Sequence, residues 1–259
     1  MDRSLPQRHP TAVGSPIGAG VVQETTLSGW NGLAALVDAH KRQTDWIYRG
    51  VTRSCFQLAP KIGRKGERKD SRVGCQGALL PYSEMEERCL LEEFERKAQP
   101  LLTLQPKTKL EWMAVAQHHE LKTRLLDWTE SLLVAAMFAT EKGRLAGSPP
   151  AIYGVRGLSE ADDGEKKDPF NLTEVKVYRP AHISDRIAPQ QAVFTVHPKP
   201  DQDFRNHPGL HCWLLDINGT LDMKLALDAV GINRAALFPG VDGLARALNW
   251  RHKWGTLRG

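Results

Sequence analysis

The sequence has few cysteines and no long apolar run, and these two absences exclude whole classes of protein. Its 259 residues include four scattered cysteines without a CxxC pair, so neither a disulfide scaffold nor a structural zinc site is predicted. Nowhere do about 18 apolar residues run together, and the N-terminal stretch lacks the apolar core of a signal peptide. We therefore expect free thiols, no metal, no membrane partner and a cytoplasmic location.

The chain also lacks the short motifs of common enzyme classes. There is no glycine-rich phosphate loop, no GxSxG elbow, no HExxH sequence and no triad-like spacing of Ser, His and Asp. A net charge of +5 favours contact with phosphate groups but is too small to indicate a nucleic-acid binder. What is present is an ordinary globular composition, 41% hydrophobic and 25% charged, which permits a sizeable core.

Helical patterns dominate the first half of the chain and strand patterns the second. Residues 1–22 are rich in Pro, Gly and Ser without periodicity, which predicts a disordered tail. Apolar residues at helical spacing follow, and a polar, basic stretch at 63–77 predicts a surface loop. After residue 150 the apolar runs become short and β-branched or aromatic. We predict a single-domain α+β fold, with helices of the N-terminal half packed on a mainly antiparallel sheet from the C-terminal half.

Individual elements can be placed from their spacing. Ser83 is positioned to cap a helix that shows helical spacing through Met85, Cys89, Leu90 and Phe94. The segment LLVAAMFA is apolar nearly all round, which predicts a fully buried helix. The predicted helices are 28–43, 84–102, 107–121, 129–139 and 223–230, with a last one inside 234–254, and the predicted strands are 45–50, 151–157, 173–180, 191–198 and 211–217.

The densest polar cluster is QHHELKTRLLDWTES, residues 117–131. If one helix ends near Leu121 and the next begins near Thr129, KTRLLDW is a tight connector that leads into the buried helix. Asp127 or Thr129 would then cap that helix, and Arg124 would pair with Asp127 or with the end of the preceding helix. Under this interpretation the cluster is a buried structural network that fixes one helix against another.

The second interpretation of the same cluster is a ligand pocket. Gln117, His118, Thr123 and Arg124 would offer hydrogen-bond donors to a phosphate-bearing or amide ligand. A metal site at His118 and His119 is less favoured, because adjacent residues of a helix point about 100° apart and no separate carboxylate or cysteine partner is evident. The residues alone leave the structural and the functional interpretation open.

A second candidate site is the arginine in WIYRG. Arg49 ends a predicted strand, and Gly50 after it allows another backbone or a ligand to come close. A guanidinium in that position suits the capture of an anion. The alternative is a surface arginine before a turn, which the local sequence does not exclude.

The third candidate is the segment 182–197, HISDRIAPQQAVFTVH. Arg186, Gln190 and Gln191 precede a predicted strand, where they either reach a ligand or line a loop. The two histidines of the segment, His182 and His197, are interpreted as surface or capping residues rather than as bases.

In this order the motifs resemble the FRG-domain family, a bacterial family named for a Phe-Arg-Gly motif. That motif is similar to Tyr48-Arg49-Gly50, and the family pattern Q-H-x-G-x-x-T-R-L-L-D-W-T is similar to Gln117-His118 followed by TRLLDWT at 123–129. A later R-I-x-x-Q-x-G-x-F-T element resembles 186–195, and ALFPGVDGLARAL resembles the closing segment of the family. The resemblance covers roughly 28–248.

The resemblance assigns residues 23–259 to an FRG domain, with three departures from the family pattern. Glu120 stands where the family usually has Gly, Lys122 where it has Pro, and Ala192 where it has Gly. The first two make the connector less turn-prone and add charge.

The family resemblance implies a function only by analogy. Family members often occur in contexts that suggest toxin or phage-defence roles. The order of an early Arg, a middle Thr motif and a late Gln resembles the R-[S/T]-[Q/E] layout of ADP-ribosyltransferases. One hypothesis is therefore an NAD-using, ADP-ribosyltransferase-like enzyme, acting as a bacterial effector, toxin or phage-defence protein on a protein or nucleic-acid target. The alternative is a non-catalytic nucleotide-sensing or nucleic-acid-binding module.

The layout also implies roles for single residues. NAD would be bound by Arg49, Gln117, Thr123, Arg124 and Asp127, and the catalytic residues would be His118 and Gln190. In this scheme Arg49 contacts the pyrophosphate, Asp127 braces the start of the helix, and Gln190 orients the ribose. A glutamine cannot act as a base, so another group would have to remove the proton. The lack of a clear catalytic carboxylate favours the sensing module, whereas the ordered trio of motifs favours the enzyme.

Overall fold

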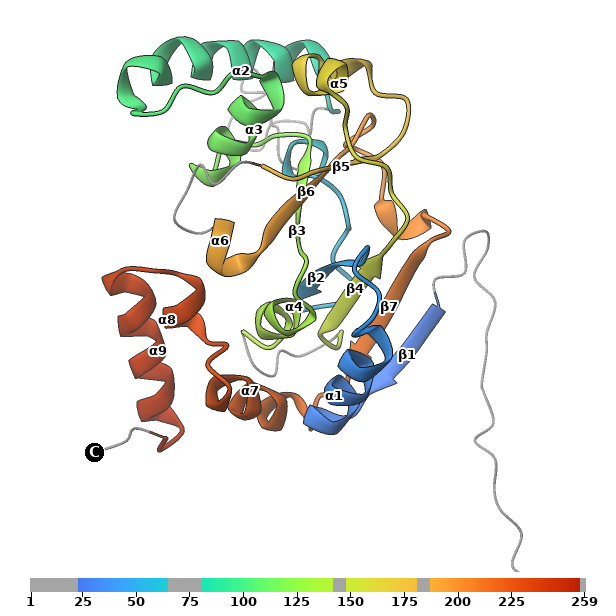
Figure 1. The fold of residues 1–259 in the computed structure, drawn as a ribbon, viewed down its shortest axis with the longest axis vertical. Helices are drawn as coiled ribbons and strands as arrows, with labels where there is room; N and C mark the ends of the chain where they lie inside the picture. Colours follow the sequence, from blue (N-terminus) through green and yellow to red (C-terminus); the bar gives the residue numbers. More distant parts are fainter. Residues whose placement is uncertain (1–22, 65–80, 142–147, 181–186, 257–259) are drawn as a thin grey trace, which may run out of the picture.

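The computed structural model describes residues 23–64, 81–141, 148–180 and 187–256, and these share one sheet with helices around it (Figure 1). Seven strands lie in the order β1-β7-β4-β2-β3-β6-β5. Only β1 and β7 pair in parallel, and each of the other neighbouring pairs is antiparallel. The strands are β1 (Gln23–Leu27), β2 (Ile47–Val51), β3 (Leu125–Thr129), β4 (Ala151–Val155), β5 (Lys176–Tyr178), β6 (Ala192–Val196) and β7 (Leu210–Leu215).

The helices come from all parts of the described chain. The α-helices are α1 (Gly29–His40), α2 (Glu84–Ala98), α3 (Lys109–His118), α4 (Leu132–Ala139), α5 (Asp163–Lys167), α6 (Ile187–Gln190), α7 (Thr220–Ala229), α8 (Arg234–Leu237) and α9 (Val241–Lys253). Short 3-10 turns are η1 (Lys61–Gly63), η3 (Gln99–Leu101), η4 (Pro169–Asn171) and η5 (Phe204–Asn206). No helix among the described segments is long and apolar enough to cross a membrane.

The α+β class and the mainly antiparallel sheet are confirmed, but the expected separation into an N-terminal helical half and a C-terminal sheet is not found. Strands β1, β2 and β3 all come from the first half of the chain, and α7, α8 and α9 come from the second. The predicted tail 1–22 and most of the predicted loop 63–77 lie outside the described residues.

The largest difference from the sequence prediction is in TRLLDWT, which was expected to be a connector and instead contains β3, an interior strand of the sheet. Leu126 and Trp128 face one hydrophobic core, and Leu125 faces another. A strand buried on both faces reads as a near-continuous apolar run without the polar alternation of a half-buried strand. The cap of the buried helix α4 is correspondingly Ser131, whose side chain accepts from Val134 N, and not Asp127 or Thr129.

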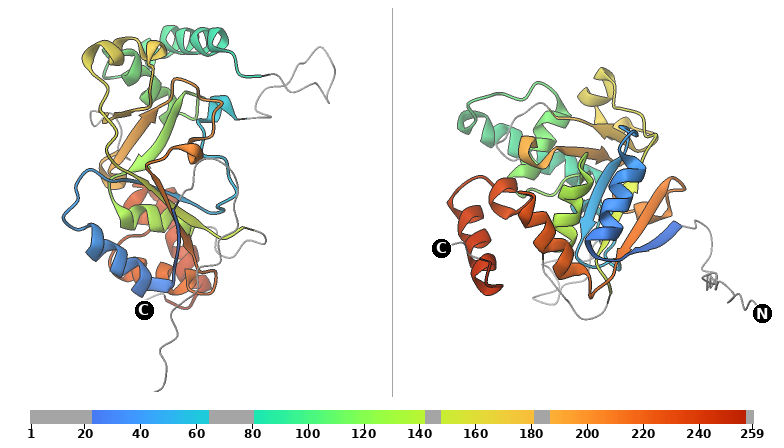
Figure 2. Two further views of the ribbon diagram at one scale, coloured as in Figure 1. Left: turned by 90° about the vertical axis from the view of Figure 1, so that its right-hand side faces the viewer. Right: turned by 60° about the horizontal axis from the view of Figure 1, so that its bottom comes forward.

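Two groups of helices cover one face of the sheet. Helices α1, α4 and α7 contribute to the core over β2, β4 and β7, whereas α2 and α3 contribute to the core over β3, β5 and β6. In Figure 1 the second group lies at the top and α1 and α7 lie at the bottom, with α4 between them. The opposite face of the sheet is covered by loop residues such as Leu58 and Phe204. Figure 2 shows from other directions that α9 forms the periphery of the molecule.

The packing around Gly50 explains why the WIYRG motif needs a glycine. A Cβ on Gly50 would lie 1.8 Å from the carbonyl oxygen of Ala135 and 2.6 Å from the amide of Ala139, both in α4. Helix α4 therefore packs directly on the backbone of β2 next to Arg49. The glycine fixes the distance between the buried helix and the strand that carries the arginine.

Candidate functional site

The sheet is almost unpaired between β2 and β3. These strands share one paired position, Tyr48 with Thr129, whereas β2 with β4 and β3 with β6 each share five. The register places Arg49 immediately beyond that single pair, on the side where the two strands stop pairing. Side chains rather than backbone hydrogen bonds therefore join the two halves of the sheet at this point.

Arg49 bridges the unpaired stretch. Its Nη1 donates to the carbonyl oxygen of Asp127 and lies 3.6 Å from the Oδ2 atom of the same residue. Burial lowers the pKa of the Arg49 guanidinium, and the charge of Asp127 acts in the opposite direction. The side chain is still 20% exposed, and within the described residues only its Nη1 is engaged in hydrogen bonds. Nε and Nη2 therefore have no hydrogen-bond partner among the described residues.

The carboxylate of Asp127 is exposed yet held at both oxygens. Gln117 Nε2 donates to Oδ1 at 2.7 Å, and Arg49 faces Oδ2. The Asp127 side chain is 60% exposed, although it lies on the same sheet face as the buried Leu125 and Thr129. Ion pairs this exposed contribute little to stability. An exposed carboxylate with a fixed orientation is consequently a better candidate for ligand binding or proton transfer than for structural support.

Thr123 extends this chain of hydrogen bonds into the interior. Its hydroxyl donates to Gln117 Oε1 at 2.5 Å and accepts from the amide of Leu125 at 3.2 Å. The bond to Oε1 sets the orientation of the Gln117 amide, which directs its NH2 group toward Asp127. Thr123 is itself buried. Thr123 therefore positions Gln117. The pocket interpretation, which had Thr123 facing a ligand, is wrong on this point.

Arg124 belongs to a different network and is a correction to the predicted site. The side chain is fully buried, and its Nε and Nη2 bind Glu87 of α2 at 3.2 and 2.9 Å. Nη1 donates to the carbonyl oxygen of Pro169, and Nη2 also donates to the Tyr82 hydroxyl. With all three nitrogens engaged, Arg124 offers no donor to a ligand, and it pairs with Glu87 rather than with Asp127.

Residues 44–146 match the family model of the FRG domain. Over this segment the chain is similar to the FRG domain. The matched segment includes β2, α3 and β3, and thus holds all four members of the Arg49–Asp127–Gln117–Thr123 chain. No curated protein matches the chain, and no solved structure does.

The left-handed residue after α3 accounts for one family position. Glu120 has φ of 69°, in the region that favours glycine, and the FRG pattern usually has glycine there. The amides of Glu120 and Leu121 close the helix end by donating to Gln117 O and Ala116 O. The turn thus forms in this chain despite the glutamate, and it sets the end of α3 that carries Gln117.

The two expected catalytic residues, Gln190 and His118, are not members of the Arg49–Asp127–Gln117–Thr123 chain. Gln190 lies beyond the segment matched to the FRG domain, and its Nε2 donates to the carbonyl oxygen of Leu237 at 2.9 Å. Its own carbonyl accepts from the Thr129 hydroxyl at 2.6 Å, so Gln190 ties α6 to α8 and to β3. Its side chain is thus used within the protein. Arg186 and His182 fall outside the described residues.

His118 is half-buried and follows Gln117 at the end of α3. Its ring lies 5.0 Å from that of His119 with the two planes at 80°. The described residues contain no group of three or more His, Cys, Asp or Glu side chains that could hold a metal ion. His118 therefore lies next to Gln117, and its contact with the His119 ring does not indicate a role.

His197 is the residue near the site that sequence reasoning placed wrongly. It is 2% exposed rather than on the surface, and its Nε2 lies 2.8 Å from Thr195 Oγ1, which accepts from Trp128 Nε1. Burial lowers the pKa of His197 to about 3, and the positive charge of Arg49 acts in the same direction. A signal was present in AVFTVH, because His197 directly continues a β-branched and aromatic strand pattern, and residues 193–197 are all buried.

Proposed function

We propose that this protein binds a nucleotide between β2 and β3 and that it is an NAD-using, ADP-ribosyltransferase-like enzyme. The observation that carries the proposal is the pair formed by Arg49 and Asp127. A partly exposed guanidinium with two unengaged donor positions lies beside an exposed carboxylate whose orientation is fixed. The two groups supply an anion contact and a proton acceptor at one place.

Arg49 is the phosphate-binding residue in this proposal. Its Nε and Nη2 form no hydrogen bond within the described residues, and an arginine fork suits two oxygens of a phosphate. Because the burial of Arg49 weakens its hydration without removing its charge, a phosphate contact there is stronger than one at a fully exposed arginine.

Asp127 takes the part for which the sequence layout had offered only a glutamine. NAD would supply a ribose carbon with nicotinamide as the leaving group, and the carboxylate of Asp127 would accept the proton of the attacking nucleophile or orient a ribose hydroxyl. Gln117, held by Thr123, keeps that carboxylate in place. This moves the proposed catalytic role from Gln190 and His118 to Asp127, with Gln117 and Thr123 as positioning residues.

A nucleotide-sensing or nucleic-acid-binding module is the second candidate, and one observation favours it. Gln190 and Arg124, two residues of the predicted pocket, donate their side-chain hydrogen bonds to other residues of the protein. In that case Asp127 holds Arg49 in position and nothing is turned over. A role as an effector, toxin or phage-defence protein is proposed from the family resemblance alone.

The deciding experiment measures nicotinamide release from NAD by the full chain, with and without protein or nucleic-acid acceptors. The enzyme proposal expects release by the wild type and a fall of at least about a hundredfold for Asp127→Asn, typical of a lost general base. Asp242→Asn, a change at an exposed carboxylate of α9, serves as the matched control and should retain full activity. Binding of NAD without release would favour the sensing module, and absence of NAD binding would reject the enzyme proposal.

A further inference from the structure

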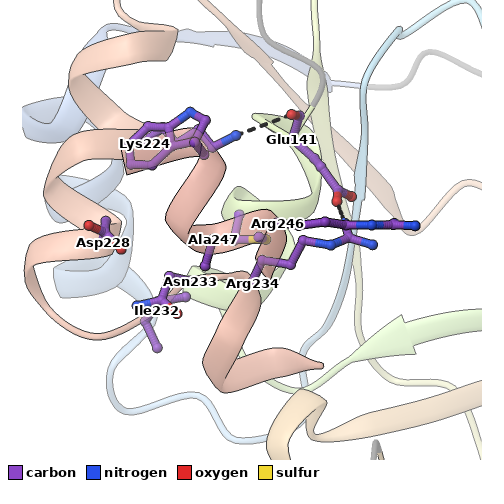
Figure 3. A pocket seen from close by; sticks show the side chains of 10 residues that line it. Glu141, Lys224, Asp228, Ile232, Asn233, Arg234, Arg246 and Ala247 are labelled. Atoms are coloured by element: carbon purple, nitrogen blue, oxygen red, sulfur yellow. Dashed lines mark hydrogen bonds and ion pairs between the residues drawn. The ribbon is translucent and has the colours of Figure 1, made fainter. Parts of the chain in front are cut away.

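The C-terminal helices enclose a cavity of about 240 Å³ that shares no residue with the Arg49–Asp127 site. Its walls come from the end of α4 and from α7, α8 and α9 (Figure 3). Three cationic side chains, Lys224, Arg234 and Arg246, line it together with two carboxylates, Glu141 and Asp228. The net charge of the cavity depends on which of these groups form ion pairs within the protein.

Both carboxylates are already neutralised. Glu141 forms an ion pair with Arg234, and Asp228 is bound by Arg251 through contacts of 2.9–3.3 Å. Among the described residues, neither Lys224 nor Arg246 forms an ion pair. Because Arg251, outside the lining, neutralises Asp228, the cations Lys224 and Arg246 both remain in excess at the cavity.

Lys224 is held in place without an ion pair to a carboxylate among the described residues. Its Nζ donates to the main-chain carbonyl of Glu141 at 3.1 Å and lies 4.9 Å from the centre of the Trp250 ring. Burial lowers the pKa of Lys224, and the nearby Asp228 partly opposes that shift. The ammonium is thus partly desolvated and aimed at the cavity that it lines, as Figure 3 shows.

Arg234 supplies the second, independent sign of an absent partner. Its Nε is buried and has no hydrogen-bond partner within the described residues. Burial lowers the pKa of Arg234, and the positive charge of Arg246 lowers it further, which means that two guanidinium groups lie close together. Figure 3 shows both side chains directed to the same side of the cavity, near Glu141. An anion placed between them would relieve the repulsion.

Apart from Asn233, the rest of the cavity wall is apolar, with Met137, Ile232 and the indole of Trp250. A dry cavity of roughly 150 Å³ is large enough for benzene, so this one has room for a single flat ring with a small charged group attached. The ring would lie against apolar and aromatic surface, and the charged group would lie among the cations.

We propose that this cavity binds a small phosphate monoester carried by a single flat ring. A phosphate monoester has a charge of nearly −2 at neutral pH, which matches the two cations in excess, whereas a carboxylate would neutralise only one. Its oxygens can also accept from the fork of Arg246 and from the ammonium of Lys224, which both line the cavity. The proposal is independent of the nucleotide site, because it uses none of its residues.

The experiment is calorimetric titration of the full chain with phenyl phosphate, inorganic phosphate, benzoate and phenol. Phenyl phosphate should bind most tightly, inorganic phosphate and benzoate at least about tenfold more weakly, and phenol not measurably, because charge and ring are both required. The phosphate assignment is overturned if benzoate binds as tightly as phenyl phosphate. The site itself is rejected if the wild type does not bind phenyl phosphate.

Variants locate the binding within the cavity. Arg246 is exposed, so Arg246→Gln should leave the fold intact and weaken phenyl phosphate roughly tenfold to a hundredfold, the effect of one charge-assisted contact. Arg42→Gln, at an exposed arginine after α1, is the matched control, and Arg49→Ala tests independence from the nucleotide site. Both should bind like the wild type. Equal binding by Arg246→Gln, or loss of binding in Arg42→Gln, would show that phenyl phosphate does not occupy this cavity.

Discussion

Arg124, next to β3, and Glu87 of α2 form an ion pair in the protein interior. Nη2 of Arg124 lies 2.9 Å from Oε2 of Glu87, and the two side chains are 0% and 2% exposed. The amide of Arg124 also donates to Glu87, and the Tyr82 hydroxyl bonds to both side chains. The ring of Phe170 lies 4.1 Å from the guanidinium. This network attaches α2 to β3 and thereby supports the strand that carries Asp127.

We expect Arg124→Met to destabilise the protein by roughly 3–5 kcal/mol, because Glu87 would remain buried without its partner. Combining it with Glu87→Leu should recover part of the loss, since no unpaired charge then remains in the core. Asp127→Ala should cost less than about 1 kcal/mol, as expected for an exposed ion pair. Urea unfolding of the four proteins provides the measurement. An Arg124→Met protein as stable as the wild type would contradict the buried network.

Gly50→Ala tests the contact between β2 and α4. The new methyl group would meet the backbone of Ala135 at 1.8 Å, and backbone cannot rotate away as a side chain can. We expect a loss of about 3 kcal/mol or more, at the upper end for overpacked cores. Gly164→Ala, in the exposed helix α5, is the control and should change stability by less than about 1 kcal/mol. Equal melting temperatures for the two variants would mean that α4 does not pack on Gly50.

His197 should make the protein sensitive to acid. Its pKa is lowered to about 3 in the folded state, so between its ordinary value near 6.5 and pH 3 the unfolded chain binds a proton that the folded chain does not. Stability is thus fully present above pH 6.5 and is lost as the pH falls, by about 2 kcal/mol at pH 5. His40 and His207, whose pKa values are also lowered by burial, act with the same sign.

The contribution of His197 is isolated by comparing slopes. His197→Gln should show a smaller loss of unfolding free energy between pH 7 and pH 5 than the wild type, by about 2 kcal/mol, whatever its stability at pH 7. The exposed His252 is the control position, and His252→Gln should keep the wild-type slope. A slope unchanged in His197→Gln would show that His197 is accessible to protons in the folded protein.

Sequence reasoning was most accurate where a local pattern is sufficient. The Ser83 cap is confirmed, since its side chain accepts from the amide of Glu86. LLVAAMFA is the buried helix α4, as its uniform apolarity predicted. The strand patterns after residue 150 also correspond to β4, β5, β6 and β7. In each case the residues that decide the structure lie within one segment.

Long-range partners decided what sequence reasoning missed. Met85 of α2 was expected to face the core but is 76% exposed, because the buried face carries Leu91 and Glu87. Glu87 could be assigned to the buried face only if its partner were known. That partner, Arg124, lies 37 residues away in the sequence. The same applies to Arg124 and Asp127, which are three residues apart and have opposite burial. Nothing local to TRLLDWT distinguishes them.

Four residues of the predicted site are joined in the structure, whereas their contacts could not be predicted from the sequence. Arg49, Gln117, Thr123 and Asp127 do lie in one hydrogen-bonded chain, although β2 and β3 are far apart in sequence. The exposure of Asp127 was not predicted because a capping function for α4 explained the residue equally well from sequence. Only the extra strand β3, which moves the start of α4 to Ser131, leaves the carboxylate free to face outward.

The last prediction concerns the fork of Arg49, whose two unengaged nitrogens are the basis of the proposed nucleotide contact. Arg49→Ala should weaken NAD binding roughly tenfold to a hundredfold, the loss of one charge-assisted hydrogen bond to phosphate. Arg49→Lys should restore only part of this, because an ammonium cannot engage two phosphate oxygens and the Asp127 carbonyl in one plane. Asp127→Asn should instead leave NAD affinity nearly unchanged or slightly raised, since it removes a negative charge beside the phosphate, while nicotinamide release falls. Calorimetry with NAD and ADP-ribose on the four proteins separates these effects, with melting temperatures measured in parallel to exclude unfolding. If Arg49→Lys binds as tightly as the wild type, Arg49 acts only as a general positive charge, and the two-point phosphate contact is wrong.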